Sequence, residues 1–153
     1  MTFGPSQLRT IADYQFGEGA GEALFAPGVE LSIRRSSSGR PRQVFRDGER
    51  LVSLGTDGRF TLGLAGGRAV QSALDPPAYR VVVGEESAPY IREGHNVFAK
   101  FVRSVDSALR AGDEVLIEHE DGTLLGVGRA ELDATAMADF ETGMAVSTRE
   151  GAE

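Results

Sequence analysis

Residues 89–102, PYIREGHNVFAKFV, decide the fold of the second half of this chain. Ser87 is a residue type that often caps helix N-termini, and Gly94 suits the left-handed position that ends a helix, so a short helix is expected between them. Residues 96–103 are rich in β-branched and aromatic side chains, which favours a strand. The stretch therefore predicts a helix, a glycine turn and a strand in immediate succession.

Further strands are expected on both sides of this stretch. One over residues 79–83 precedes it. Downstream we expect a helical turn over residues 106–109, followed by three strands over residues 114–119, 123–131 and 144–148. Asp121-Gly122 is expected to close a hairpin, and Asp133 to cap a second short helix that runs through Phe140. Short strands, regular turns and two short helices indicate a small, partly closed β pseudo-barrel.

The first half has a different pattern. After Ser6, taken as an N-cap, the apolar residues follow a helical period. Asp47-Gly48 and Asp57-Gly58 then predict two tight hairpins. They separate the strand-like segments 29–35, 42–46, 50–54 and 59–64, and a closing helix is expected over residues 69–74. The prolines of Asp75-Pro76-Pro77 can continue neither a helix nor a ladder. We therefore predict an α+β protein, with a small α/β domain over residues 1–76 whose strands form an antiparallel meander, and the pseudo-barrel over residues 77–150.

Charge is distributed unevenly along the chain. The 153 residues carry 23 acidic and 16 basic side chains, a net charge of −7, and Lys100 is the only lysine. This composition favours a protein of a very salty cytoplasm. Residues 1–76 have a net charge of +1 and residues 77–153 one of −8. Six arginines lie between residues 34 and 50 against two acids, a local charge of +4.

Several classes of protein are disfavoured by composition. There is no cysteine, which excludes disulfides and zinc–thiolate sites. No segment has the apolar length of a signal peptide core or a membrane span, so we expect a soluble, cytoplasmic protein with no membrane partner. The Gly17–Gly21 run lacks the spacing of a phosphate loop, and no second ligand group is spaced near His95 or His119 for a metal. We expect no catalytic residue, no metal and no cofactor.

Two resemblances give these elements an identity. Residues 80–83, 89–102, 111–115, 125–130 and 137–143 resemble, in order, the PUA domain, which is named for pseudouridine synthases and archaeosine transglycosylases. Residues 11–17, 19–21 and 57–62 are similar to the small domain that precedes PUA in archaeosine tRNA-guanine transglycosylases. The resemblance implies a pseudo-barrel that binds structured RNA, usually tRNA, and positions it for a partner active site.

The resemblance also implies which residues contact RNA. In PUA domains the first helix, the glycine loop, the following strand and the last strand face the RNA. The candidates at those positions are Arg92, Gly94, His95, Asn96, Lys100, Arg103 and Arg149. A glycine lets the backbone approach a sugar or phosphate, an amide can bind a base edge or a 2′-OH, and cations can bind phosphates. Alternatively, Gly94 serves only to end a helix. Phe98 and Phe101 are expected in the core.

A second candidate RNA surface is the arginine cluster, represented by Arg35, Arg40 and Arg42. Guanidinium groups suit phosphate, although alternation along a strand would also place half of these side chains beside carboxylates. The favoured function is a non-catalytic RNA-binding protein for tRNA or another structured RNA, linked to RNA modification. Two alternatives stay open: an accessory subunit of a split archaeosine tRNA-guanine transglycosylase, and a small enzyme or ligand-binding protein on the same barrel. The RNA, the partner enzyme and the oligomeric state stay undetermined.

Overall fold

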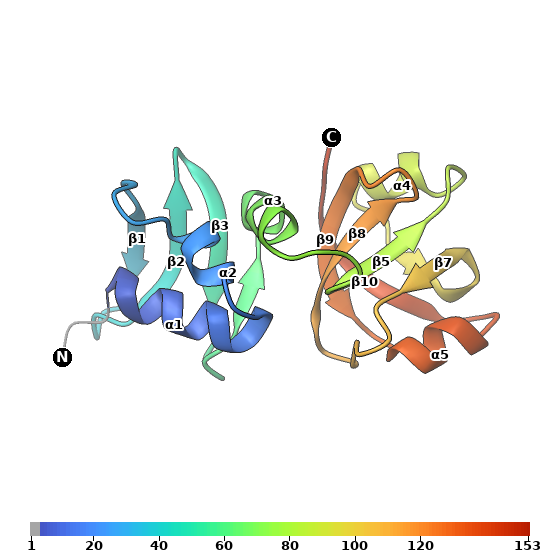
Figure 1. Ribbon diagram of the computed structural model, residues 1–153, viewed down its shortest axis with the longest axis horizontal. Coiled ribbons are helices and arrows are strands. Elements are labelled where there is room, and N and C mark those ends of the chain that lie inside the picture. Colours follow the sequence, from blue (N-terminus) through green and yellow to red (C-terminus); the bar gives the residue numbers. More distant parts are fainter. Residues whose placement is uncertain (1–3) are drawn as a thin grey trace. The chain divides into compact units, whose positions relative to one another are not determined.

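A computed structural model describes residues 4–153. The chain divides between Asp75 and Pro76 into two compact units, called here the first and the second unit (Figure 1). The predicted α+β class is confirmed, because both units combine helices with antiparallel strands. Within the described residues, no helix has the length and apolar character that a membrane crossing needs.

The first unit is a four-stranded antiparallel meander with three helices. Its strands pair in chain order, β1–β2–β3–β4. The elements are α1 (Pro5–Phe16), α2 (Ala20–Leu24), β1 (Ser32–Arg35), β2 (Pro41–Arg46), β3 (Glu49–Leu54), β4 (Phe60–Leu62) and α3 (Leu64–Ala73). Asp47 and Gly48 both have positive φ, 51° and 78°, as a two-residue type I′ hairpin requires. The meander predicted from these turns is therefore present.

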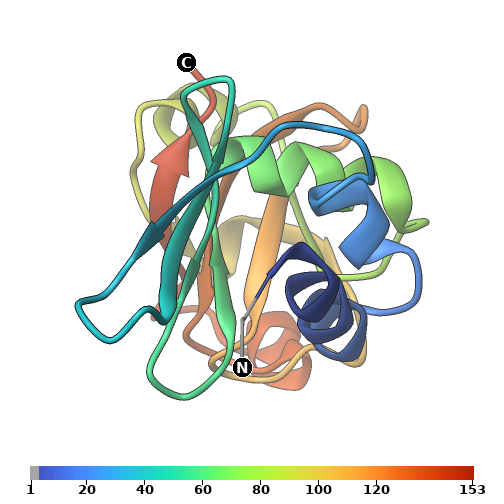
Figure 2. The same cartoon turned by 90° about the vertical axis from the view of Figure 1, so that its left-hand side faces the viewer.

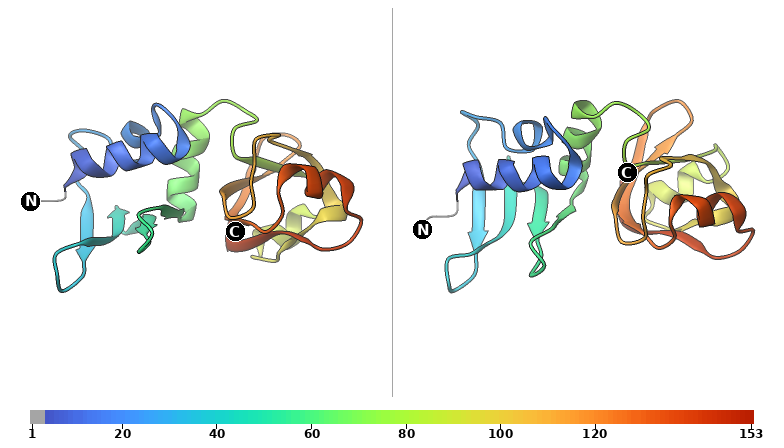
Figure 3. Two further views of the ribbon diagram at one scale, coloured as in Figure 1. Left: turned by 90° about the horizontal axis from the view of Figure 1, so that it is seen from below. Right: turned by 60° about the horizontal axis from the view of Figure 1, so that its bottom comes forward.

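The meander has an apolar and a polar side, because side chains alternate along each strand. One row of cross-strand neighbours is Ile33, Val44, Val52 and Leu62. The next row, called here the polar row, is Arg34, Gln43, Ser53 and Thr61. Helices α1 and α2 lie over one side of this sheet (Figures 2 and 3). The apolar row faces these helices, since three of its four members are almost fully buried.

Glycine allows the helices of the first unit to pack closely. A Cβ on Gly21 would collide with the Arg9 backbone, and the Gly21 N–H donates to Asp13 Oδ1 at 2.7 Å. A Cβ on Gly66 would likewise collide with the Leu51 carbonyl oxygen. The glycine run around Gly21 therefore serves contact between α1 and α2, in agreement with the rejection of a phosphate loop.

The second unit is a six-stranded, nearly closed barrel with the strand order β6–β10–β9–β8–β5–β7. Its elements are β5 (Arg80–Val83), α4 (Ala88–Arg92), β6 (Val97–Phe98), the 3₁₀ turn η1 (Ala99–Phe101), β7 (Val102–Val105), β8 (Glu114–His119), β9 (Leu124–Ala130), α5 (Ala134–Asp139) and β10 (Met144–Gly151). Alternate residues such as Val115 and Ile117 are buried in its core, and Ile91 and Met137 bring α4 and α5 onto it. The Asp133 side chain caps α5 by accepting the Ala136 N–H at 2.8 Å, as predicted.

Three local predictions are wrong. Helix α1 begins at Pro5, because Gly4 is the N-cap and its N–H donates to Gln7 Oε1 at 2.9 Å; Ser6 lies inside the helix. Helix α3 begins at Leu64 rather than at residue 69, since tight packing of its glycines offsets their poor helix propensity. The single strand expected over residues 96–103 is interrupted by η1, where the Ala99 N–H donates to the Gly143 carbonyl at 2.9 Å.

Candidate nucleic-acid interface

The turn after α4 is built around Gly94. The Gly94 N–H donates to the Ile91 carbonyl at 2.9 Å and the His95 N–H donates to the Tyr90 carbonyl at 3.0 Å, which is the Schellman pattern that ends a helix. Gly94 has φ +94°, and no heavy atom beyond its two chain neighbours lies within 4 Å of the place a Cβ would occupy. This turn, called here the Gly94 corner, is therefore left-handed and open to solvent. Ser87 occupies the N-cap of α4 but its side chain makes no capping hydrogen bond.

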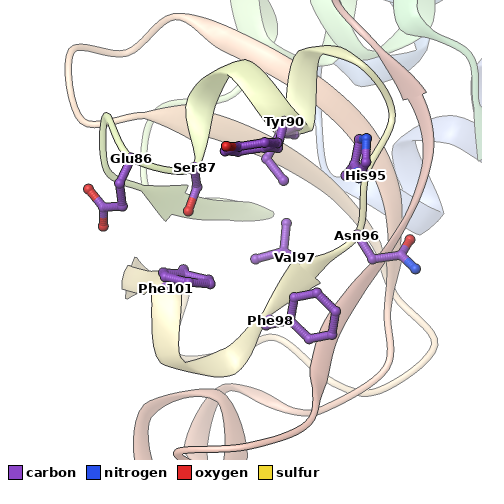
Figure 4. A pocket seen from close by; sticks show the side chains of 9 residues that line it. Glu86, Ser87, Tyr90, His95, Asn96, Val97, Phe98 and Phe101 are labelled. Carbon is purple, nitrogen blue, oxygen red and sulfur yellow. The ribbon is translucent and has the colours of Figure 1, made fainter.

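A hollow of about 250 Å³ opens beside the Gly94 corner (Figure 4). We call it the aromatic hollow. It is lined by Glu86, Ser87, Tyr90, Ile91, His95, Asn96, Val97, Phe98 and Phe101. Tyr90 is 59% exposed, and its ring meets the His95 ring edge-on at 5.9 Å between centroids. Tyr90 was missed by the sequence analysis, although its place next to the apolar Ile91 in α4 puts it on the exposed side of that helix.

The prediction that Phe98 belongs to the core is wrong. Phe98 is 49% exposed, whereas its neighbours Val97 and Ala99 are almost fully buried. The alternation of β6 puts Val97 inside, and η1 then turns Ala99 inward as well, so Phe98 lies between two inward residues. Phe101 is partly buried. The two phenylalanines thus form part of a surface that an unstacked base could contact.

Phe98 and Phe101 also line a second hollow of about 400 Å³. Its other lining residues are Lys100, Glu141, Thr142 and Gly143. Lys100 is exposed, and its ammonium lies 5.0 Å from the centroid of the Phe101 ring. The only lysine of the chain is therefore held at the edge of the aromatic surface, where it adds a positive charge to it.

The predicted contact residues near the Gly94 corner differ in whether their polar groups already have a partner within the protein. Asn96 Oδ1 accepts the Thr148 N–H at 3.0 Å, so this oxygen ties the corner to β10 and the side-chain amide is the group left to donate. His95 Nε2 lies 3.7 Å from Glu93 Oε2, and both side chains are exposed. Arg92 is exposed and, among the described residues, has no ion-pair partner.

Arg103 and Arg149 are engaged within the second unit. Arg103 donates to Glu86 Oε1 at 2.6 Å, and its Nε lies 3.7 Å from Glu120 Oε1. Arg149 donates to both carboxylate oxygens of Glu114, at 2.7 and 2.9 Å, and Glu114 is only 4% exposed. The guanidinium of Arg149 neutralises an almost buried carboxylate, which favours a structural role for this residue.

His119 contacts acidic side chains from two loops, Glu85 and Asp121. Its Nε2 contacts Glu85 Oε2 at 2.5 Å, and its Nδ1 accepts the Asp121 N–H at 3.1 Å. The hydrogen bond to Glu85 raises the pKa of His119 above its ordinary value near 6.5, while the Thr123 N–H lowers the pKa of Asp121. Within residues 4–153, no three His, Cys, Asp or Glu side chains converge to hold a metal.

The arginine candidates of the first unit contact different groups. Arg35 Nη1 donates to the Gly39 carbonyl at 3.0 Å and Arg40 Nη2 donates to the Gly55 carbonyl at 2.5 Å, so both stabilise turns. Arg42 is exposed on β2. Arg34, the first arginine of the predicted cluster, lies over the Phe45 ring at 4.4 Å. The register of β1 with β2 makes this contact possible, because Ser32, two residues before Arg34, is the cross-strand neighbour of Phe45.

Comparison with known families agrees with these two units. Residues 79–152 match the PUA domain family, and residues 6–77 match the patch-forming domain C2 of tRNA-guanine transglycosylase. The second unit therefore belongs to the PUA domain family. More particularly, a transglycosylase-type C2 domain precedes this PUA domain, and the two together resemble the C-terminal region of archaeal tRNA-guanine transglycosylases.

Individual relatives give the extent of this similarity. The chain is 45% identical over 147 residues to a tRNA-guanine(15) transglycosylase of Pyrococcus furiosus and 43% identical over 146 residues to one of Methanothermobacter thermautotrophicus. Each match covers 95% of this chain but only 24% and 22% of the relative. The chain thus spans about a quarter of the length of these enzymes.

Two solved structures share the fold across both units. A hypothetical protein from Pyrococcus horikoshii is 19% identical with a TM-score of 0.70, covering 97% of this chain and 90% of that one. A conserved PUA domain protein from Thermoplasma acidophilum is 20% identical with a TM-score of 0.64, covering 94% and 89%. At this level of identity the likeness concerns the fold alone.

Proposed function

We propose that these residues form a non-catalytic RNA-binding protein, which binds tRNA or another structured RNA through the Gly94 corner and the aromatic hollow of its PUA domain. The observation that carries the proposal is the exposure of Tyr90 and Phe98 around a hollow at an open backbone turn. Tyr90 and Phe98 line the same hollow, so their rings form one joint surface rather than isolated exposed side chains, and bases can stack on such a surface. Relatives named as tRNA-guanine transglycosylases make RNA the matching partner.

The polar groups around the hollow suit RNA as well. The Asn96 side-chain amide can donate to a base edge or a 2′-OH, and Arg92 and Lys100 can bind phosphates. We place Gly94 and His95 at the closest approach of the RNA backbone. Because Arg103 and Arg149 already pair with carboxylates, we assign them to the support of this surface rather than to direct contact.

The charge of the second unit sets the conditions for binding. Glu86 lines the hollow, Glu85 and Glu93 are close to its lining residues in the sequence, and residues 77–153 carry a net charge of −8. At about 1 M salt the Debye length falls to about 3 Å, so diffuse repulsion fades and hydrogen bonds and stacking decide. We propose that the protein works in a salty archaeal cytoplasm.

The test is binding of unfractionated folded tRNA to the full chain at high KCl, measured by fluorescence anisotropy. Tyr90→Ala is expected to raise Kd about tenfold, since one base–aromatic stack contributes about 1–3 kcal/mol. Tyr14→Ala is the matched control, because Tyr14 is 96% exposed on α1 in the first unit. Equal Kd values for wild type and both variants would place the RNA elsewhere, and no tRNA binding at all would refute the function.

A second candidate function is an accessory subunit of a tRNA-guanine transglycosylase. It is favoured by the match to only 22–24% of enzymes that are 43–45% identical to this chain. Co-purification with a chain that supplies the remaining part, and recovery of base exchange on mixing, would support it. An enzyme of its own on this barrel is the less favoured alternative, because neither a pair of carboxylates nor both histidines line the aromatic hollow.

A further inference from the structure

The open side of the meander in the first unit carries the polar row, Arg34–Gln43–Ser53–Thr61. These four side chains are cross-strand neighbours on β1, β2, β3 and β4, and each is at least partly exposed. Adjacent strands lie about 4.8 Å apart, so the row spans roughly 14 Å. A guanidinium, an amide and two hydroxyls thus form one line of hydrogen-bonding groups across the sheet.

A cation is held at one end of this line. The Arg34 guanidinium lies over the Phe45 ring at 4.4 Å from its centroid. On β2, Phe45 lies two residues after Gln43, and on β1 its cross-strand neighbour Ser32 lies two residues before Arg34. The Phe45 ring and the Arg34 guanidinium therefore lie on the same, open side of the sheet. Stacking on a ring leaves the N–H edges of a guanidinium available to phosphate oxygens. Among the described residues, Arg34 has no carboxylate partner.

A second cation lies beside the row. Arg50 Nη1 donates to Ser53 Oγ at 2.9 Å, and its Nη2 is 3.5 Å from the Leu62 carbonyl. The bulge in β3 between Arg50 and Val52 turns Arg50 to the same side as Ser53. The open side of the sheet therefore presents two guanidinium groups, one at the outer strand and one near the middle.

The charge around the row selects its occupant. Residues 34–50 have a local charge of +4, while the rest of the chain amounts to −11. At the salt concentration proposed above this charge acts only at short range, so it favours direct contact of a polyanion with this sheet over contact with most of the remaining surface. We propose that the polar row, with Arg34 and Arg50, binds the phosphate backbone of the same structured RNA; this inference rests on the proposed function, because RNA is the polyanion concerned.

The experiment compares Arg34→Gln with Arg68→Gln in the full chain. Arg68 is an exposed arginine on α3, outside the cluster, so both changes remove one positive charge from the first unit. Kd for unfractionated folded tRNA is measured at several KCl concentrations. Arg34→Gln is expected to raise Kd about threefold to tenfold and to reduce the salt slope of log Kd by about one, as loss of one phosphate contact does. Arg68→Gln is expected to stay within about twofold of wild type.

Three results would overturn the inference in distinguishable ways. If Arg34→Gln and Arg68→Gln change Kd equally while Tyr90→Ala weakens binding, the polar row does not contact RNA but the proposed function stands. If Arg34→Gln abolishes self-association in size-exclusion chromatography and leaves tRNA binding unchanged, the polar row contacts a second copy of this acidic chain and not RNA. If wild type binds no tRNA, the proposed function fails and this inference with it. Thermal unfolding of each variant verifies that the fold is intact.

Discussion

Arg149 holds both carboxylate oxygens of Glu114, at 2.7 and 2.9 Å, across two strands of the PUA barrel. Glu114 is 4% exposed, so the loss of Arg149 would leave a buried, charged carboxylate without the guanidinium that contacts both of its oxygens. The pair therefore links the end of β10 to the start of β8.

Removing this guanidinium is expected to destabilise the protein. Arg149→Ala should lower the free energy of unfolding by about 2–4 kcal/mol, somewhat less than a fully buried pair would because Arg149 is partly exposed. Urea denaturation gives the value. Arg129→Ala is the control: Arg129 lies 3.4 Å from Glu131 in an exposed pair, and its loss should cost less than about 1 kcal/mol. Equal losses for the two variants would show that Glu114 does not depend on Arg149.

The Gly94 corner is expected to depend on backbone conformation rather than on space. Gly94→Ala should cost about 1–2 kcal/mol of unfolding free energy, since φ is +94° and the site is otherwise open. Gly94→Asn should cost less, because asparagine tolerates left-handed backbone better. Both are measured by urea denaturation. An alanine variant as stable as wild type would mean that the corner relaxes to another turn.

Lys100 is expected to contribute charge to RNA binding. Lys100→Glu should raise Kd for folded tRNA about tenfold, through the lost phosphate contact and added repulsion. Lys100→Arg keeps the charge and should bind within about threefold of wild type. Anisotropy titrations at fixed KCl give both values. Unchanged affinity in Lys100→Glu would remove the second hollow from the RNA surface.

Stability is expected to depend on pH through His119. Its pKa is raised in the folded protein, chiefly by the hydrogen bond to Glu85. A raised folded-state pKa stabilises the fold fully below the unfolded value near 6.5, and this contribution is lost as pH rises through the folded-state pKa. The lowered pKa of Asp121 acts in a separate window, below its ordinary value of 3.8.

The measurement is the unfolding midpoint in urea between about pH 5.5 and 8.5, for wild type and His119→Gln. Wild type should lose stability relative to the variant as pH rises across this range. Glu85→Gln removes the charged acceptor and should reduce the same difference. Parallel curves for wild type and His119→Gln would show that His119 has the same pKa in the folded and unfolded chain.

Salt is expected to stabilise the folded protein. The net charge of −7 gives self-repulsion, and raising KCl from about 0.1 to 1 M shortens the Debye length from about 10 to 3 Å. Tm should therefore increase over this range. A Tm that falls with KCl would contradict the proposal that the protein works in a salty cytoplasm.

The sequence predicted those elements whose stop signals are local. Asp-Gly turns located the hairpins, Asp133 located α5, and Gly94 located the end of α4, because each of these residue types has a particular backbone preference. Phe98 could not be placed in this way. Its exposure depends on η1, which is held by a hydrogen bond to the carbonyl of Gly143, distant along the chain.

The candidate site was predicted in part for the same reason. The Gly94 corner follows from local sequence, whereas the pairing of Arg149 with Glu114 joins residues 35 positions apart. Composition shows that arginines are concentrated between residues 34 and 50 but not which of them bind turn carbonyls. Strand register decides this, since it places Arg34 beside Phe45 and leaves Arg40 bonded to Gly55.

All nine residues around the aromatic hollow lie between Glu86 and Phe101. The lining of the hollow thus comes from one short contiguous segment, but the conformation of that segment depends on residues elsewhere in the barrel, since the Gly143 carbonyl holds η1 and the Thr148 N–H holds Asn96. A graft of this segment onto another PUA domain would therefore reproduce the aromatic surface only in a recipient whose last strand, with the turn before it, supplies the same two hydrogen bonds.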